Sequence, residues 1–249
     1  MKNVGIIIQA RKGSTRLPNK MVLPFYENKG ILELILGKLK SSYPELNIIL
    51  ATTISTKDDE LEAIARKLEI KTFRGNEQDV LDRFINAANV YKLDTLIRVC
   101  ADNPFLDVAH ISSLIDEIQT DETLDYVSYK IDDTPSIKTH LGLFTEAVRL
   151  AALKKVDQSV EKDSMYREHV TNFIYANEDV FKIKFLTSPL KDKNVNRIRL
   201  TLDTQRDFDM LRGLYKKYSI CSSDELIDHL KNDSQILEEM SDLIEYNQK

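Results

Sequence analysis

Short apolar runs alternate with longer segments of helical periodicity through the first 120 residues. The run at residues 4–10 is rich in Ile and Val and predicts a buried strand. Three more strands and four helices are predicted, at residues 46–51, 70–73 and 95–100 and at residues 31–43, 57–68, 79–91 and 107–119. Strands that alternate with helices favour a parallel sheet with helices on both faces. The sequence therefore predicts an α/β fold with an open, mostly parallel sheet flanked by helices.

The pattern after residue 120 is less regular. Strands are predicted at residues 126–131, 181–186 and 197–202, and helices at residues 145–155, 164–173, 204–218, 223–231 and 234–247. A chain of 249 residues fits one α/β domain with added elements. We interpret residues 1–249 as a single domain, with a regular half at 1–120 and an elaborated half at 121–249.

Two features bear on the cellular compartment. Cys100 and Cys221 are the two cysteines, and neither has the spacing of a metal site or a disulfide framework, which favours a reducing cytoplasm. The apolar run at residues 4–8 is much shorter than the roughly 20 residues of a spanning helix. We expect a cytoplasmic protein without membrane insertion.

The distribution of charge argues against a nucleic-acid partner. The formal net charge is −5, whereas proteins that grip a nucleic-acid backbone usually carry a basic face. The one dense basic cluster comprises Arg11, Lys12, Arg16 and Lys20. A cluster this compact suits a triphosphate better than a duplex.

This cluster lies in a predicted loop, QARKGSTRLPNK at residues 9–20, directly after the first strand. In open α/β sheets, ligands bind at the carboxyl ends of strands. Backbone N–H groups near Gly13 and Ser14 could cradle phosphate oxygens, with arginine and lysine side chains adding charge. The loop matches neither the P-loop pattern nor the dinucleotide fingerprint. Its composition alone leaves phosphate binding and a solvated basic turn equally open.

Two predicted strands end at an aspartate. Asp102 follows the strand at 95–100, and Asp203 follows the segment at 197–202. Mg²⁺ commonly takes one or two carboxylates together with substrate phosphates. Each aspartate could instead cap the next helix. The pair favours a shared metal, because both carboxylates would face the same edge of one sheet.

Other polar motifs are weaker. Arg167 and His169, in the motif REHVTNF, could contact an anionic acceptor, but a charged helix face is the simpler interpretation. Residues 79–84 predict an amphipathic helix, with Val80, Leu81 and Phe84 inward. No serine or cysteine nucleophile motif is visible.

Taken together and in order, six motifs resemble the cytidylyltransferase family that includes CMP-KDO and CMP-sialic acid synthetases, and most closely its SpsF-like, spore-coat polysaccharide branch. They are QARKGSTRLPNK at 9–20, RGNEQDVLDRF at 74–84, RVCADNPF at 98–105, GLFTE at 142–146, REHVTNFIY at 167–175 and RLTLDTQRDF at 199–208.

The resemblance implies a GT-A-like fold and an Mg²⁺-dependent reaction in which an acceptor oxygen attacks the α-phosphate of CTP. CMP would pass to a small sugar or sugar-acid acceptor, with release of pyrophosphate. Residues 1–120 would form the nucleotide-binding half, and 121–249 the half for acceptor binding and dimerisation. A homodimer is common in the family, and we would place its interface within residues 125–190.

Matching positions carry the family's site roles to this chain. Arg11, Lys20, Asp102 and Asp203 would be catalytic, with Asp102 and Asp203 as the metal ligands. The nucleotide would contact a larger set: Gln9, Ala10, Arg11, Gly13, Ser14, Arg16, Lys20, Ala101 and Asp102. Arg74, Glu146, Arg167 and His169 would lie toward the acceptor.

Two departures from the family pattern keep other functions open. The segment IKTHL before Gly142 lacks the proline and glycine that the family pattern leads us to expect. Ala101 stands where the family usually has glycine, and it adds a methyl group where the backbone approaches the nucleotide. The alternatives are a nucleotidyltransferase that uses another nucleotide or a sugar phosphate, and a weakly catalytic scaffold that binds nucleotide.

Overall fold

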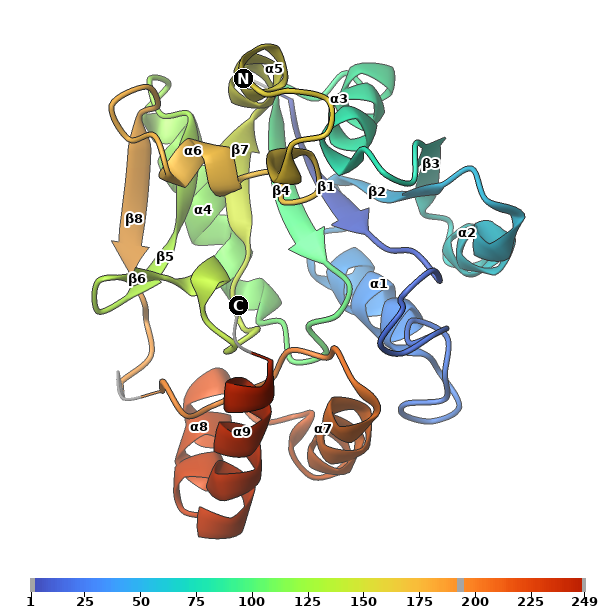
Figure 1. The fold of residues 1–249 in the computed structure, drawn as a ribbon, viewed down its shortest axis with the longest axis vertical. Helices are drawn as coiled ribbons and strands as arrows, with labels where there is room; N and C mark the ends of the chain where they lie inside the picture. Colours follow the sequence, from blue (N-terminus) through green and yellow to red (C-terminus); the bar gives the residue numbers. More distant parts are fainter. Residues whose placement is uncertain (1–2, 192–194, 248–249) are drawn as a thin grey trace.

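The computed structural model of the chain describes residues 3–191 and 195–247, and within them it forms one mixed sheet of eight strands with helices on both faces (Figure 1). The strand order is β3-β2-β1-β4-β7-β5-β6, with β8 also paired to β5. The predicted α/β class is confirmed.

The first half of the chain is the regular, parallel part. Strands β1 (Val4–Gln9), β2 (Asn47–Thr53), β3 (Lys71–Gly75) and β4 (Thr95–Cys100) are parallel to one another. The helices between and after them are α1 (Ile31–Ser42), α2 (Asp59–Lys67), α3 (Val80–Val90) and α4 (Ile111–Thr120). The carboxyl ends of β1 and β4 are neighbours, because these two strands pair directly.

The second half extends the same sheet. Strand β7 (Glu146–Arg149) lies antiparallel between β4 and β5 (Tyr126–Ile131), and β8 (Ile183–Thr187) runs parallel to β5. Strand β6 (Thr134–Pro135) forms a short hairpin with β5. Helices α5 (Leu150–Ser159) and α6 (Asn172–Tyr175) complete this half.

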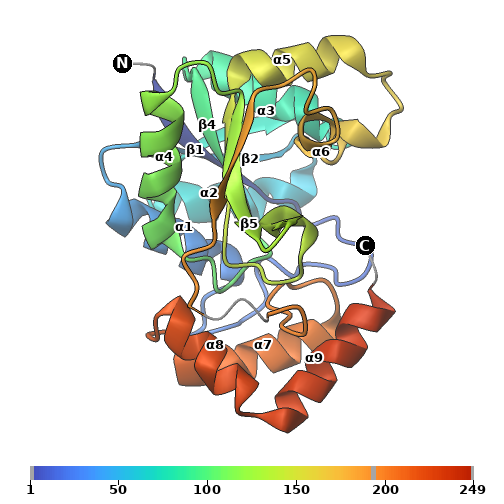
Figure 2. The same cartoon turned by 90° about the vertical axis from the view of Figure 1, so that its left-hand side faces the viewer.

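Three C-terminal helices form a layer beside the carboxyl ends of β1 and β4 (Figures 1 and 2). They are α7 (Gln205–Tyr218), α8 (Ser223–Lys231) and α9 (Ser234–Tyr246). Capping boxes start α7, at Thr204 and Asp207, and α8, at Ser222 and Glu225. In both motifs a side-chain oxygen satisfies backbone N–H groups that have no partner inside the helix.

The sheet separates two hydrophobic clusters. Ile6 and Ile8 of β1 pack with α1 and α4 on one face, whereas Ile7 packs with α3 and α5 on the other. This follows from the alternation of side chains along a strand. No helix within residues 3–191 and 195–247 combines the length and apolar character that crossing a membrane requires.

Three predicted elements are wrong in part. The helix predicted at 145–155 begins as strand β7, because Ala147 and Val148 are buried between two neighbouring strands and only the segment from Leu150 is helical. The helix predicted at 164–173 is a 3₁₀ turn at Met165–Arg167, followed by α6 from Asn172.

The third correction affects the site. Residues 197–202 are predicted as a strand, yet they join no sheet ladder. Leu200 and Leu202 are buried in the core under the loop after β4, so the apolar alternation reports that burial rather than strand pairing. Leu200 N donates to His140 O at 2.9 Å, and Leu202 N donates to Asp102 O at 2.9 Å.

Candidate active site

The loop after β1 is fixed by a buried carboxylate. Asp58, at the start of α2, accepts a 2.8 Å hydrogen bond from Lys12 N. Its other oxygen accepts from Thr52 Oγ1 at 3.0 Å and from Thr53 Oγ1 at 2.5 Å. Hydrogen bonds to an ionised acceptor are stronger than neutral ones. The basic loop is therefore anchored to the carboxyl end of β2, while the Lys12 ammonium pairs with Glu60 at 2.5 Å.

Lys20 joins three segments of the chain. Its buried ammonium donates to Leu202 O at 2.7 Å. It lies 3.3 Å from Asp102 Oδ2 and 3.9 Å from Asp203 Oδ1. The structure thus brings Lys20, Asp102 and Asp203 together, although Asp203 follows an extended segment rather than a strand.

Asp203 is surrounded by cations. Arg16 Nη2 lies 2.7 Å from its Oδ1, and Arg199 Nη2 lies 3.0 Å from its Oδ2. Arg199 is fully buried and also pairs with Asp207 at 2.7 Å. Although burial alone would raise the pKa of Asp207, hydrogen bonds and charge from Arg199 hold that pKa below its usual value. The Asp203 carboxylate is therefore held in place from behind by Arg199.

The end of the last helix reaches the same place. Asn247, directly after α9, accepts a 3.4 Å hydrogen bond from Arg16 Nη1, and its own Nδ2 donates to Leu243 O at 2.9 Å. Arg16 is thereby oriented from two sides, by Asp203 and by Asn247.

The carboxylates of Asp102 and Asp203 fit a metal ion that is coordinated by both protein and phosphate oxygens. Asp203 is almost buried, Asp102 is one-third exposed, and both carboxylates face the Lys20 ammonium. Mg²⁺ usually takes one or two carboxylates and completes its shell with phosphate and water. Among the described residues no group of three or more His, Cys, Asp or Glu side chains could hold a metal alone. These two carboxylates fit Mg²⁺ only together with substrate oxygens.

Arg11 faces a different part of the site. Its guanidinium lies 3.5 Å from Glu168 Oε1 and 3.9 Å from Glu77 Oε1. Both distances are long for charged partners. A Cβ added at Gly13 would lie 2.9 Å from Glu77 Oε1, so Glu77 rests against the basic loop. The loops after β1 and β3 therefore meet at Glu77.

Of four further predicted nucleotide contacts, Gln9, Ala10 and Ser14 belong to the end of β1 and its loop, and Ala101 directly follows the neighbouring strand β4. Gln9 ends β1, and its buried Oε1 has no hydrogen-bond partner. Ala10 is buried, and Ala101 N donates to Gln9 O at 3.3 Å. Ala101 does not have positive φ, so alanine adopts this backbone without strain. Ser14 Oγ accepts from Leu17 N at 3.3 Å, which tightens the loop.

The residues predicted to bind the acceptor do not form one cluster. Arg74 pairs with Asp59 at 2.6 Å and with Glu62 at 3.0 Å, on the β3 side of the sheet. Arg167 lies between Asp79 and Asp157, with both distances 2.6 Å.

Glu146 and His169 lie in opposite environments. Glu146 is 1% exposed; its carboxylate is 2.6 Å from Arg98 and accepts from Thr171 Oγ1 at 3.0 Å, and Tyr126 also donates to it. His169 is exposed to solvent. Glu146 in this structure holds the sheet together, and His169 is accessible to a ligand.

Sequence reasoning missed Asp58, Arg199, Arg83 and Asn247. Arg83 and Arg199 both stand inside family motifs, at 74–84 and 199–208, which is a signal that could have singled them out. No motif in the sequence singles out Asp58, and Asn247 is predicted only as the end of the helix at 234–247.

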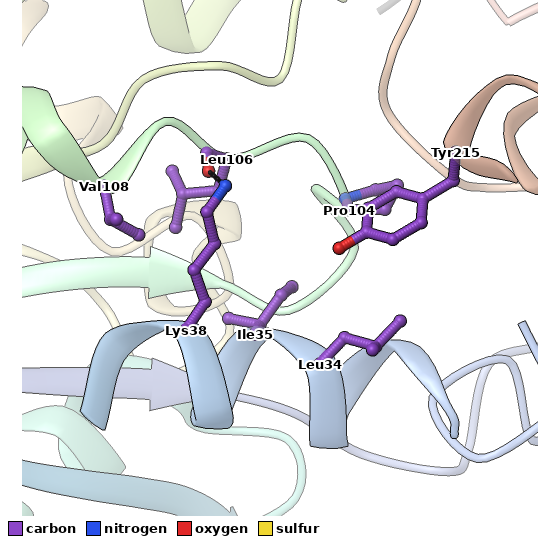
Figure 3. Close-up of a pocket in the computed structure, with 7 residues that line it drawn as sticks. All are labelled: Leu34, Ile35, Lys38, Pro104, Leu106, Val108 and Tyr215. Carbon is purple, nitrogen blue, oxygen red and sulfur yellow. Dashed lines mark hydrogen bonds between the residues drawn. The ribbon is translucent and has the colours of Figure 1, made fainter. Parts of the chain in front are cut away.

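An apolar pocket lies between α1, the loop after β4 and Tyr215 of α7 (Figure 3). Leu34, Ile35, Lys38, Pro104, Leu106, Val108 and Tyr215 line it. Lys38 Nζ, from α1, donates to Leu106 O on the facing loop at 2.8 Å. Burial lowers the pKa of Lys38, and Asp107 partly offsets this. The pocket contains no site residue, and the lysine bond supports the loop after β4.

Comparisons with known proteins show the family to which the chain belongs. A family model described as cytidylyltransferase matches residues 5–248. An uncharacterised protein of Methanocaldococcus jannaschii is 39% identical over 238 residues, 95% of this chain and 93% of that protein. The spore coat polysaccharide biosynthesis protein SpsF of Bacillus subtilis is 32% identical over 221 residues, 87% of this chain and 88% of that protein.

The chain is also similar to solved structures. A cytidylyltransferase of Leptospira borgpetersenii serovar Hardjo-bovis has a TM-score of 0.81 and 30% identity, covering 95% of this chain and 97% of that one. A CMP:2-keto-3-deoxy-manno-octonic acid synthetase complexed with CTP has a TM-score of 0.61. At 14% identity over 86% of this chain and 99% of that one, it shows the fold alone.

Proposed function

The chain belongs to the cytidylyltransferase family and is a nucleotidyltransferase, and on this premise we propose that it transfers CMP from CTP to a sugar or sugar-acid acceptor, with release of pyrophosphate. The observation that carries the proposal is the meeting of Lys20 with Asp102 and Asp203 at the end of β4, beside Arg16. By similarity to SpsF, we propose surface polysaccharide biosynthesis as the setting.

Phosphoryl-type transfer depends on positioning and charge neutralisation. In this proposal Arg16 and Lys20 bind the β- and γ-phosphates and stabilise the departing pyrophosphate, and Arg11 joins them from the Glu77 side. Each cation now rests on a carboxylate, and a triphosphate would exchange for those carboxylates. The hydrogen bond from Arg16 Nη1 to Asn247 would keep the Arg16 guanidinium oriented during this exchange.

Asp102 and Asp203 would hold Mg²⁺. When bound, the metal would neutralise charge at the α-phosphate and lower the pKa of the attacking hydroxyl. Arg199 and Asp207 keep the Asp203 carboxylate in its orientation. The Lys20 ammonium would be displaced by Mg²⁺ held by the carboxylates of Asp102 and Asp203, and it would then be available to the phosphates.

On the acceptor side, His169 and Arg167 remain our proposal, with Arg74 and Glu146 acting at greater distance. An anionic acceptor would bind Arg167 by displacing Asp79 or Asp157 from it. Glu146 would act by holding Arg98 and the sheet beneath the site.

We also propose that the enzyme is a cytoplasmic homodimer with its interface within residues 125–190. Met165 and Val180, two large apolar side chains in that range, are 64% and 40% exposed, which supports a contact there. Light scattering on the purified chain tests this, and a monomer at working concentration would contradict it.

The test of the main proposal is a thermal-shift panel with CTP, UTP, GTP and ATP, each with and without Mg²⁺. A nucleotide at about 100 times its Kd should add roughly 2.7 kcal/mol to the free energy of unfolding. A shift confined to CTP with Mg²⁺ supports the proposal and leads to pyrophosphate-release assays with acidic sugars. A shift with another nucleotide changes the substrate, and nucleotide binding without turnover on any acceptor supports a scaffold.

A further inference from the structure

Within residues 3–191 and 195–247, five buried side-chain nitrogen or oxygen atoms have no hydrogen-bond partner. Three of them belong to Arg83 and Gln9, beside the candidate nucleotide loop. Buried polar atoms in native proteins are almost always paired, so atoms without a partner indicate a missing ligand or water.

Arg83 is the more informative of the two residues. It is fully buried, and its Nη1 donates to Asn76 O at 2.7 Å. Its Nε and Nη2 are the unpaired atoms. These two N–H groups lie on the same edge of the guanidinium, where they form a fork that fits two adjacent acceptor atoms. Burial and the nearby charge of Arg11 lower the pKa of Arg83 to about 10, so it remains a cation at neutral pH.

The fork lies near the junction of two loops. Arg83 is in α3, close to the charges of Arg11 and Glu77. Glu77 bridges the loops after β1 and β3, since it contacts Arg11 and rests against Gly13. Lys20 lies at the other end of the same basic loop, beside Asp102 after β4. A triphosphate held at Lys20 leaves the β3 side of the loop for the nucleoside.

Building on the proposed function, we propose that Arg83 selects the base, with its Nε and Nη2 donating to N3 and O2 of cytosine. Cytosine presents these two acceptors side by side. Uracil carries a proton on N3, which would face the donors of the fork and oppose binding. The Watson–Crick edges of adenine and guanine place a donor beside each acceptor, so neither matches two adjacent donors.

Gln9 supplies an independent observation. Its unpaired Oε1 is an acceptor, the type of atom that the N4 amino group of cytosine requires. Gln9 lies two residues after Ile7 along β1, so the two side chains point to the same face of the sheet, and Ile7 packs with Leu81 and Phe84 of α3. Gln9 therefore lies on the sheet face that α3 covers. One acceptor and two donors complement the edge of cytosine, which offers one donor and two acceptors.

Contact with Arg83 requires the side chains around it to move. The ion pairs of Arg11 with Glu168 and Glu77 span 3.5 and 3.9 Å, and both carboxylate partners are well exposed. A triphosphate that draws Arg11 away from Glu77 would free the junction between the two loops. Base recognition and phosphate binding would then be linked through Arg11.

The experiment measures equilibrium binding of CTP, UTP, GTP and 3-deaza-CTP, in which a C–H replaces N3 and O2 is kept. The proteins are the wild type, Arg83→Met and the control Arg66→Met, whose side chain is exposed on α2. Wild type and control should bind CTP roughly 5- to 150-fold more tightly than UTP or 3-deaza-CTP. In Arg83→Met the ratios of affinity for CTP over UTP and for CTP over 3-deaza-CTP should both approach one.

Equal affinity of the wild type for CTP and 3-deaza-CTP overturns the inference, whatever the stability of the variant. A variant that keeps the CTP preference, or that weakens all four nucleotides equally, also overturns it. If the wild type binds GTP and Arg83→Met does not, the fork recognises the O6 and N7 edge of guanine and the proposal is wrong. Absence of any CTP binding by the wild type removes the proposed function itself, which distinguishes the two failures.

Discussion

The backbone N–H of Leu202 donates to the carbonyl oxygen of Asp102 at 2.9 Å. This bond fastens the segment before α7 to the loop after β4. It places the carboxylates of Asp102 and Asp203 around one ammonium, that of Lys20. Lys20 is therefore the cation that both carboxylates share, while Asp203 also pairs with Arg16 and Arg199.

Asp203→Asn should lower kcat by at least about 10²-fold, the size seen when a key electrostatic stabiliser is lost. The substitution removes a charge that Arg16 and Arg199 now share. Pyrophosphate release checks this, with Asp209→Asn on the exposed face of α7 as the matched control. Near-normal turnover would remove Asp203 from the site. The same measurement on Asp102→Asn should give a loss of similar size.

Lys20→Met should weaken CTP binding by about 10-fold or more, since a hydrogen bond to a charged group contributes roughly 1.5–3 kcal/mol. It should also increase the thermal shift caused by Mg²⁺ alone, because the ammonium no longer competes for the two carboxylates. Differential scanning fluorimetry with Mg²⁺ and with CTP measures both effects. An unchanged response to Mg²⁺ would show that the lysine and the metal do not share this position.

Asp58→Asn should reduce the free energy of unfolding by about 2 kcal/mol, within the range for buried hydrogen bonds to a charged acceptor. Because Asp58 anchors Lys12 N, the KM for nucleotide should rise more than kcat falls. Chemical denaturation and steady-state kinetics test this against Asp116→Asn, an exposed position on α4. Equal effects on kcat and KM would argue that the anchor does not act through the loop.

The pH dependence of stability should depend on Asp107. Burial opposes its ionised form, but hydrogen bonds from His110 and Ser223 prevail and lower its pKa from 3.8 to about 2. A carboxyl with a lowered folded pKa stabilises the protein above the unfolded value, and this contribution is lost as pH falls through the folded value. Asp107→Asn should cost roughly 2 kcal/mol near pH 6 and progressively less as pH falls from about 4 toward 2. A cost independent of pH would refute this.

Much of the fold follows from apolar patterning. The bounds of β4 and β5 agree with the prediction to the residue, because both strands are short buried runs between polar segments. Patterning fails where burial has another cause. Leu200 and Leu202 alternate like a strand, but they fill the core beneath the site without pairing.

Part of the candidate site could be predicted from the sequence. Asp102 and Asp203 were predicted to follow two strands at one sheet edge. Both lie near the Lys20 ammonium, at 3.3 and 3.9 Å, but a backbone hydrogen bond from Leu202 to Asp102 stands in place of the second strand. Arg83 lies inside a family motif, but its burial could not be predicted, because an arginine in an amphipathic helix is expected on the polar face, whereas the loop over α3 encloses this one. That enclosure depends on a loop whose path no local pattern specifies.

The ion pair between Arg16 and Asp203 closes a separation of 187 residues along the chain. Contacts of such long range form late in folding, because closing a long loop costs chain entropy before any contact compensates for it. The sheet can therefore assemble before the site exists. A ligand that binds at this contact would link the loop after β1 to the C-terminal helices. Those helices should then resist proteolysis when the site is occupied, even at positions far from the ligand.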